Sequence, residues 1–310
     1  MLIGDFSSLV ARAATLSSQR VVVINPTNEE TFLSIVDARK QLGVRFTLTG
    51  NDAMARNGLA AVGATEEGVE IVDCSTVAPA LEAGIDLVRL GKGDILMKGS
   101  VDTSTMMKAA LREESGLRTD RLLSDIFVLE YHGREQNKFV MITDGGMTLA
   151  PDLKNKMELI RNAVDVAHAL GNQLPRVAVL SATEFVLPNL PSTLDAAALS
   201  KMNERGQIKG CIVDGPFALD NAVSVEAARE KGIRSEVAGR ADILLAANIE
   251  SANSLAKSTT YFAGLPLAHV IVGARIPILI PSRADKSEAR LFSMALGMIM
   301  REFSQRQSEE

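Results

Sequence analysis

Residues 20–50, RVVVINPTNEETFLSIVDARKQLGVRFTLTG, contain the pattern that decides the fold. Two short apolar runs flank a longer segment in which apolar residues recur at helical spacing. Thr27 and Glu30 form a capping-box pattern that predicts the start of this helix, and Gly43 predicts its end. A strand–helix–strand order of this kind predicts two parallel strands joined by a right-handed crossover.

The same alternation continues along the chain. Most apolar runs are continuous rather than alternating, as in strands that are covered on both faces. Between them lie further helical segments, one of which runs from Pro151 to Gly171 with its apolar residues on one face. We therefore predict an α/β protein with mostly parallel sheets. The Gly145–Gly146 turn, near the midpoint of the strand count, places a domain boundary near residue 145.

Composition narrows the class of protein. The 310 residues are enough for two domains, and 46% apolar with 23% charged residues is typical of a folded globular protein. The formal net charge of −5, with no block of lysine or arginine, argues against a nucleic-acid partner. We expect no membrane association and a cytoplasmic location, because no apolar segment reaches spanning length and the N-terminus lacks a signal-peptide pattern.

Several common sites are missing from the sequence. It has no GxxxxGK[ST] loop, no GxSxG elbow and no glycine-rich turn after the first strand. The three histidines, at 132, 168 and 269, lack the spacing of a helical zinc pair, so we predict no metal site. Cys74 and Cys211 are far apart in apolar runs, which favours reduced core thiols.

The stretch IPILIPSRADKSEAR, residues 276–290, places polar groups at the end of an apolar run. Ligands of α/β sheets bind beyond the carboxyl ends of the strands, which is where Ser282, Arg283 and Asp285 lie. Asp285 and Glu288 also have the spacing of an N-cap that begins a helix. A guanidinium gains nothing from the dipole at a helix N-terminus. Arg283 therefore indicates a phosphate or carboxylate bound there.

Two further polar clusters allow both a structural and a functional interpretation. Asn253 and Lys257 are four residues apart and share one helix face, where the lysine either binds a phosphate or is simply solvated. The turn that begins at Lys98 opens a helix, so its hydroxyl groups and lysines either cradle an anion or cap that helix. The residues of this cluster are Lys98, Ser100, Thr103, Ser104 and Lys108.

From about Asp94 to the C-terminus, the chain resembles the phosphate acyltransferases, which comprise phosphate acetyltransferases and phosphate butyryltransferases. The resemblance is closest to the butyryltransferase branch. It rests on six stretches in order: ILMKGSVDTSTMMKAAL, GLRTDRLLSDIFVLE, ITDGGMTLAPDL, STLDAAALSKMNERGQIKGCIVDGPFALDNAVS, ADILLAANIESANSLAKSTTYFAG and VGARIPILIPSRADKSEARL.

The resemblance implies a fold and a reaction. The fold has two three-layer α/β/α domains with mostly parallel sheets, like isocitrate and isopropylmalate dehydrogenases, and an active site in the cleft between them. Residues 1–144 with 284–310 form the first domain and 145–283 the second. The reaction is reversible: acyl-CoA plus inorganic phosphate gives acyl phosphate plus CoA, without a further cofactor. The family also implies a homodimer.

The resemblance assigns roles to individual residues. The family's Ser-Arg pair maps onto Ser282 and Arg283, which would contact the acyl carbonyl and the transferring phosphate. The acetyltransferase branch carries its catalytic aspartate near the positions of Glu288 and Ala289. This chain has none there, so Asp285 is the substitute candidate for the base. The other matched positions, expected to bind substrate, are Gly99, Ser100, Thr103, Ser104, Lys108, Asn253 and Lys257.

Three alternatives stay open at this point. The first is a metal- and NAD-dependent decarboxylating dehydrogenase of the same architecture, which would need clustered aspartates and a tyrosine–lysine pair; the chain has two tyrosines and no Asp-rich helix. The second is a non-catalytic sensor of acyl-CoA or acyl phosphate. The third concerns specificity, because acetyl and butyryl differ by only two methylene groups.

Overall fold

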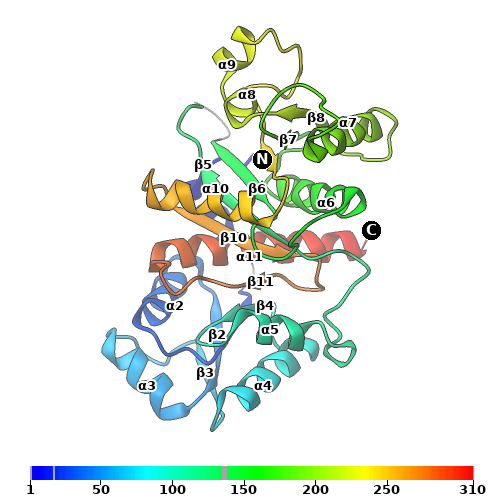
Figure 1. Cartoon of the computed structure of the whole chain (residues 1–310). Helices are drawn as coiled ribbons and strands as arrows, with labels where there is room; N and C mark the ends of the chain where they lie inside the picture. Colours follow the sequence, from blue (N-terminus) through cyan, green and yellow to red (C-terminus); the bar gives the residue numbers. More distant parts are fainter. Residues whose placement is uncertain (1, 17, 135–137, 310) are drawn as a thin grey trace. The chain divides into compact units, whose positions relative to one another are not determined.

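The computed structural model describes residues 2–16, 18–134 and 138–309, and its chain divides into two compact α/β units (Figure 1). The central unit consists of residues 1–5 and 122–267, and the terminal unit of residues 6–121 and 268–310. The α/β class and the mostly parallel sheets are confirmed. The sequence placed the boundaries at 144/145 and 283/284, whereas the contacts divide the chain at 121/122 and 267/268.

The boundary differs because the second half of the chain begins with a hairpin. Strand β5 (Ser124–Glu130) pairs antiparallel with β6 (Phe139–Thr143), and β6 pairs in turn with β9 (Ile243–Leu245). These two strands therefore belong with the segment that follows the Gly145–Gly146 turn, not with the one before it. A glycine turn inside a domain gives the same sequence signal as one between domains.

The sheet of the terminal unit has the strand order β3-β2-β1-β4-β11-β10. Strand β1 pairs in parallel with β2 and β4, while β11 pairs in parallel with β4 and antiparallel with β10. The carboxyl ends of β1, β4 and β11 therefore meet at one edge. The strands are β1 (Arg20–Ile24), β2 (Arg45–Gly50), β3 (Val69–Asp73), β4 (Ile95–Lys98), β10 (Leu267–Val272) and β11 (Ile278–Leu279).

The helices of the terminal unit form two groups. Helices α1, α2 and α11 pack against one another, with the rings of Phe6 and Phe292 stacked at 4.2 Å, while α4 packs on α5 and on strands β1 and β2. Their bounds are α1 (Phe6–Ala13), α2 (Glu29–Leu42), α3 (Asp52–Ala61), α4 (Val77–Arg89), α5 (Thr103–Ala110) and α11 (Ser287–Glu309), with a 3-10 turn at Glu113–Ser115.

The predicted capping box at the start of α2 is wrong in its residues. Asn28, not Thr27, is the N-cap, and its side chain accepts a hydrogen bond from the backbone N–H of Thr31 at 2.8 Å. The carboxylate of Glu30 instead accepts from the backbone N–H of Ser287 in α11, at 2.7 Å. A tertiary contact has therefore replaced the local one. The predicted end is confirmed, since Gly43 has a left-handed φ of 65°.

The sheet of the central unit has the order β5-β6-β9-β7-β8, in which only the β5–β6 pair is antiparallel. Its remaining strands are β7 (Arg176–Leu180) and β8 (Ile212–Phe217). Its helices are α6 (Leu153–Ala169), α7 (Pro191–Glu204), α8 (Leu219–Val223), α9 (Val225–Glu230) and α10 (Ile249–Tyr261).

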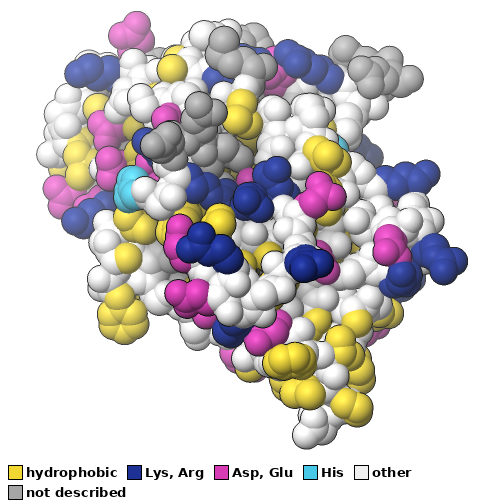
Figure 2. Space-filling view, turned by 90° about the horizontal axis from the view of Figure 1, so that it is seen from above, with side chains coloured by type: hydrophobic (Ala, Val, Ile, Leu, Met, Phe, Trp, Pro, Cys, Tyr) yellow, Lys and Arg dark blue, Asp and Glu magenta, His cyan; other side chains and the backbone are white. Residues whose placement is uncertain are grey.

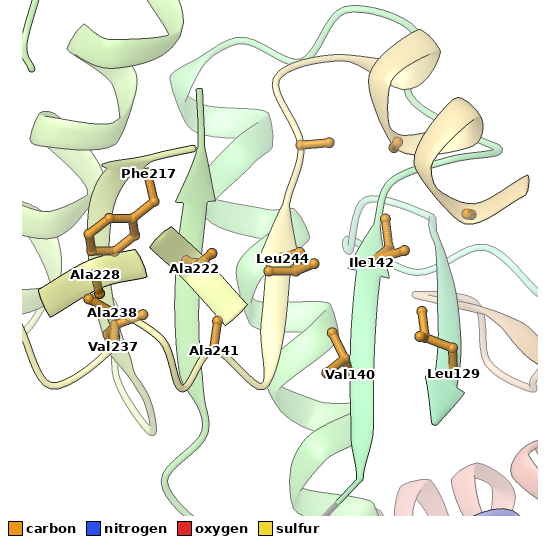
Figure 3. Packing of buried hydrophobic residues seen from close by; sticks show 14 residues of the cluster. Leu129, Val140, Ile142, Phe217, Ala222, Ala228, Val237, Ala238, Ala241 and Leu244 are labelled. Atoms are coloured by element: carbon orange, nitrogen blue, oxygen red, sulfur yellow. The ribbon is translucent and has the colours of Figure 1, made fainter. Parts of the chain in front are cut away.

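Small side chains let the short helices of the central unit approach its sheet. In Figure 3, Ile142 and Leu244 from neighbouring strands lie on the same face as Ala222 and Ala228 from α8 and α9. All four are at most 4% exposed. Removing a large aliphatic side chain from water contributes about 1.5–3 kcal/mol. The strands therefore supply most of the apolar surface, and the alanines allow the close contact.

The surface of the described residues carries both signs of charge. On the face drawn in Figure 2, Lys and Arg side chains are interspersed with Asp and Glu. No helix among the described residues combines the length and apolarity needed to cross a bilayer.

Candidate functional site

The carboxyl edge of the terminal sheet brings two of the predicted clusters to neighbouring strand ends. The β4 strand ends at Lys98 and is followed by Gly99 and Ser100, whose backbone N–H groups donate to Ile24 (2.9 Å) and Asn25 (2.8 Å). A Cβ on Gly99 would lie 2.4 Å from the carbonyl oxygen of Ile24. Only glycine therefore fits where this turn crosses the end of β1.

The loop between β11 and α11 contains the predicted catalytic residues Ser282, Arg283 and Asp285. The Asp285 carboxylate accepts a hydrogen bond from the backbone N–H of Ser282 at 2.7 Å, and the Nε2 atom of His269 lies 4.0 Å from the same oxygen. Helix α11 begins at Ser287. The prediction that Asp285 is the N-cap of this helix is therefore wrong, because its carboxylate closes the loop before the helix.

The buried side chain of Arg290 binds the backbone of this loop. Arg290, only 2% exposed, donates from Nη2 to the carbonyl oxygen of Ser282 (2.9 Å) and from Nε to that of Asp285 (3.0 Å). Its third contact is from Nη1 to the hydroxyl of Thr31 at 3.1 Å. One rigid guanidinium therefore fixes both ends of the loop to helix α2.

Charged side chains of both signs surround the loop. Burial lowers the pKa of Lys98, and the neighbouring Arg283 and Arg290 lower it further, while Asp102 and Asp285 act in the opposite direction. The side chain of Arg283 is exposed. Burial also lowers the pKa of Arg290. Lys98 and Arg283 thus repel each other near the ends of β4 and β11, and an anion bound between them would relieve this repulsion.

Helix α5 presents the remaining predicted residues of this unit. Its N-cap Asp102 accepts from the hydroxyl of Ser104 at 2.6 Å and from the backbone N–H of Thr105 at 3.0 Å. These bonds lower the pKa of Asp102. Ser104 therefore serves the cap, while Thr103 is partly exposed and Lys108 is exposed one turn after Ser104. The hydroxyl of Ser100 bonds to that of Thr27.

The central unit has its own polar loop at the carboxyl end of β6. The buried Asp144 carboxylate accepts from the backbone N–H groups of Gly146 (3.0 Å), Met147 (3.1 Å) and Thr148 (2.8 Å). Burial raises the pKa of Asp144. The side-chain amide of Asn253 donates to the carbonyl oxygen of Gly145 at 2.9 Å. Asn253 therefore helps to hold this loop.

The second predicted residue of the central unit lies beside the first. Lys257 is exposed on helix α10, one turn after Asn253 and on the same face. The structure thus brings Asn253 and Lys257 together on α10, as predicted. It also brings Gly99, Ser100, Ser282, Arg283 and Asp285 together in the terminal unit.

Sequence reasoning missed two residues of the terminal unit. Lys98 was named in a turn that either cradles an anion or caps a helix, but it was not selected as a substrate-binding residue, although it stands at the carboxyl end of a strand. Arg290 was not singled out. Its signal is its spacing, since Met294 and Met298, four and eight residues later, are completely buried. An arginine on the buried stripe of a helix requires polar partners inside the fold.

The described residues contain neither a bonded cysteine pair nor a metal-ligand cluster. Cys74 and Cys211 are free thiols, and burial raises the pKa of Cys211 to about 12. No group of three or more His, Cys, Asp or Glu side chains in this part of the chain is placed to hold a metal ion.

The chain is 42% identical over 290 residues to a probable phosphate butyryltransferase of Bacillus subtilis (strain 168), covering 94% of this chain and 96% of that protein. It is 46% identical over 233 residues to a phosphate acetyltransferase of Thermotoga maritima, covering 74% and 77%.

The fold of the chain is also similar to that of a solved structure. A branched-chain phosphotransacylase from Enterococcus faecalis V583 superposes with a TM-score of 0.82 and 29% identity, covering 91% of this chain and 99% of that one. The family model described as phosphate acetyl/butaryl transferase matches residues 75–298. The chain therefore belongs to the phosphate acetyl/butyryl transferase family.

Proposed function

We propose that this chain transfers a butyryl or similar short acyl group between CoA and inorganic phosphate, with the terminal unit binding the phosphate. The observation that carries this proposal is the placement of Lys98 and Arg283 after the neighbouring, parallel strands β4 and β11. Guanidinium and ammonium groups held together in this way favour a dianion such as phosphate. The names of the relatives supply the acyl-transfer chemistry.

The reaction requires orientation and charge stabilisation. A phosphate oxygen attacks the thioester carbonyl, a C–O bond forms, and the tetrahedral intermediate collapses by breaking the C–S bond. In the proposed roles, Arg283 and Lys98 bind the phosphate, and Ser282 donates from its hydroxyl to the acyl carbonyl or to the phosphate. Cations and hydrogen-bond donors in place before the reaction stabilise the developing oxyanion.

The proton balance gives Asp285 a proposed role. Hydrogenphosphate loses its proton as the acyl phosphate forms, and the CoA thiolate takes up a proton as it leaves. A carboxylate in the loop can carry this proton in the forward direction and act as the base for the thiol in the reverse direction. The hydrogen bond from the backbone of Ser282 fixes one oxygen of this carboxylate.

The other predicted residues bind substrate in this proposal. In the terminal unit these are Gly99, Ser100, Thr103, Ser104 and Lys108; in the central unit they are Asn253 and Lys257. Acyl-CoA, CoA, inorganic phosphate and acyl phosphate are the ligands, and no further cofactor takes part. We also propose a homodimer, which the family resemblance supports, and a cytoplasmic location.

The test is phosphate-dependent release of CoA thiol from acetyl-, butyryl- and longer acyl-CoA, followed with a thiol reagent. We expect release only with phosphate and fastest with butyryl-CoA. A higher rate with acetyl-CoA would make the chain a phosphate acetyltransferase. Absence of release with every chain length, from folded protein that binds CoA, would refute the enzyme and favour a sensor of acyl-CoA or acyl phosphate.

Two controls make this assay specific. The protein's own thiols need a blank without acyl-CoA, because Cys74 is partly exposed, whereas Cys211 is buried and has a raised pKa. Arg283→Met should abolish release. Arg306→Met, an exposed arginine whose partner is Glu302 in α11, should leave it unchanged.

A further inference from the structure

A second cluster of arginines lines a cavity at the opposite edge of the central sheet. The cavity has a volume of about 320 Å³ and lies where β7 and β9 begin. Arg176 is the first residue of β7, and Asp242 directly precedes β9. The loop of Asp144 follows the carboxyl end of β6, which runs parallel to β9. The cavity is therefore distinct from the candidate site and does not depend on the proposed function.

The charges around the cavity are unbalanced in favour of arginine. Arg134, Arg176 and Arg240 line it, together with the carboxylates of Asp242 and Glu226. Asp242, whose side chain is 4% exposed, is already engaged on both oxygens. Its Oδ1 atom lies 3.2 Å from Nη1 of Arg134, and its Oδ2 atom accepts from the backbone N–H of Arg176 at 2.8 Å. The exposed Glu226 accepts from the hydroxyl of Ser224.

One atom of the Arg176 guanidinium lacks a hydrogen-bond partner. Its Nε atom is buried and has no hydrogen-bond partner. Nearly all buried polar groups in native proteins are hydrogen-bonded, so such an atom calls for an explanation. Burial lowers the pKa of the neighbouring Arg134, and Arg176 itself contributes to that shift. The two guanidinium groups are thus close enough to repel each other.

We propose that this cavity is a second anion site, which binds the phosphate group of a small molecule between Arg176, Arg134 and Arg240. A phosphate would accept hydrogen bonds from the Nη atoms of Arg176. The cavity exceeds the volume of phosphate alone and is large enough for a phosphate monoester of a few carbon atoms.

The experiment separates this site from the candidate active site. In an Arg283→Met background, inorganic phosphate and glycerol 3-phosphate are titrated into the protein by calorimetry. We expect each chain to bind one equivalent of the probe. Adding Arg176→Met should weaken this binding at least about tenfold. Arg205→Met, at an exposed arginine of the same unit, is the matched control and should change nothing.

Each outcome decides the proposal. Tighter binding of glycerol 3-phosphate identifies a phosphate monoester as the ligand, and equal binding identifies inorganic phosphate. Failure of the Arg283→Met protein to bind either probe overturns the proposal, as does unchanged affinity after Arg176→Met. If Arg176→Met unfolds, Arg176→Lys keeps the charge but loses the fork, and Arg240→Met removes an exposed member; both should weaken binding. Unchanged affinity of both variants for the two probes would also overturn the proposal.

Discussion

Replacement of Arg290 by methionine tests the loop that holds the candidate catalytic residues. The substitution keeps the approximate length of the side chain but removes all three donors. The carbonyl oxygens of Ser282 and Asp285 lose bonds of 2.9 and 3.0 Å, and the hydroxyl of Thr31 loses one of 3.1 Å. The carboxylates of Asp285 and Glu30 lose a cation that interacts with them.

The expected loss of stability follows from these bonds. A buried acceptor left without its donor costs about 1–3 kcal/mol, and the burial of methionine returns part of this. We therefore expect the free energy of unfolding to fall by about 3 kcal/mol, within the range for removing one partner of a buried charge. With a urea slope of about 2 kcal/mol per molar, the transition midpoint should shift by about 1.5 M.

Urea unfolding and phosphate-dependent turnover should both report this change. Arg290 contacts no substrate in the proposed mechanism, so it acts as a positioning residue, and Arg290→Met should lower kcat/KM for phosphate in protein that is still folded. Arg290→Lys restores the charge but cannot reach three acceptors together, and should recover only part of the loss. The control Arg306→Met, on the same helix, should change stability by less than about 0.5 kcal/mol. A midpoint for Arg290→Met equal to that of the control would refute the reasoning.

Three further changes test the site. Because the pKa of Lys98 is lowered, its charge is lost at a lower pH than that of an ordinary lysine, so kcat/KM for phosphate should fall as pH rises through that pKa. Lys98→Met should be slow at every pH and show no such decline. In Lys98→Arg the decline should move to higher pH. The same pH profile in the unaltered protein and both variants would contradict the role proposed for Lys98. Gly99→Ala places a Cβ 2.4 Å from the oxygen of Ile24, so thermal unfolding should show a loss of about 1–3 kcal/mol; unchanged stability with full turnover would be evidence against the tight turn. Asp285→Asn retains an oxygen to accept from Ser282, so turnover should fall at least about tenfold while stability changes by less than about 1 kcal/mol. A large loss of stability with nearly unchanged turnover would instead give Asp285 a purely structural role in the loop.

The residues that follow the carboxyl ends of strands could be predicted from the sequence. Gly99, Ser100, Ser282 and Arg283 each follow an apolar run, and the parallel pairing of β4 with β11 brings the ends of those runs together. The rule that ligands bind at the carboxyl ends of parallel strands needs only the order of elements. The order of the elements along the chain is a local property of the sequence, whereas the pairing of β4 with β11 was not predicted and comes from the structure.

Contacts between segments far apart in the chain could not be predicted in this way. Glu30 forms a local capping pattern with Thr27, yet its carboxylate binds the backbone of Ser287, 257 residues later. Arg290 likewise reaches Thr31 across 259 residues. Local spacing cannot show which of two available partners prevails, because the competing partner arrives only when α2 and α11 pack.

The geometry of Asp285 shows that its structural and chemical interpretations are compatible. The Oδ2 atom accepts from the backbone of Ser282 and faces His269, while among the described residues Oδ1 accepts no hydrogen bond. Oδ1 can therefore take a proton while Oδ2 keeps the loop closed. The same bond that fixes the loop also orients the carboxylate that the proposed proton transfer needs. In this interpretation the aspartate of the acetyltransferase branch has been replaced by one nearer the Ser-Arg pair, and its position is set by the loop rather than by the helix.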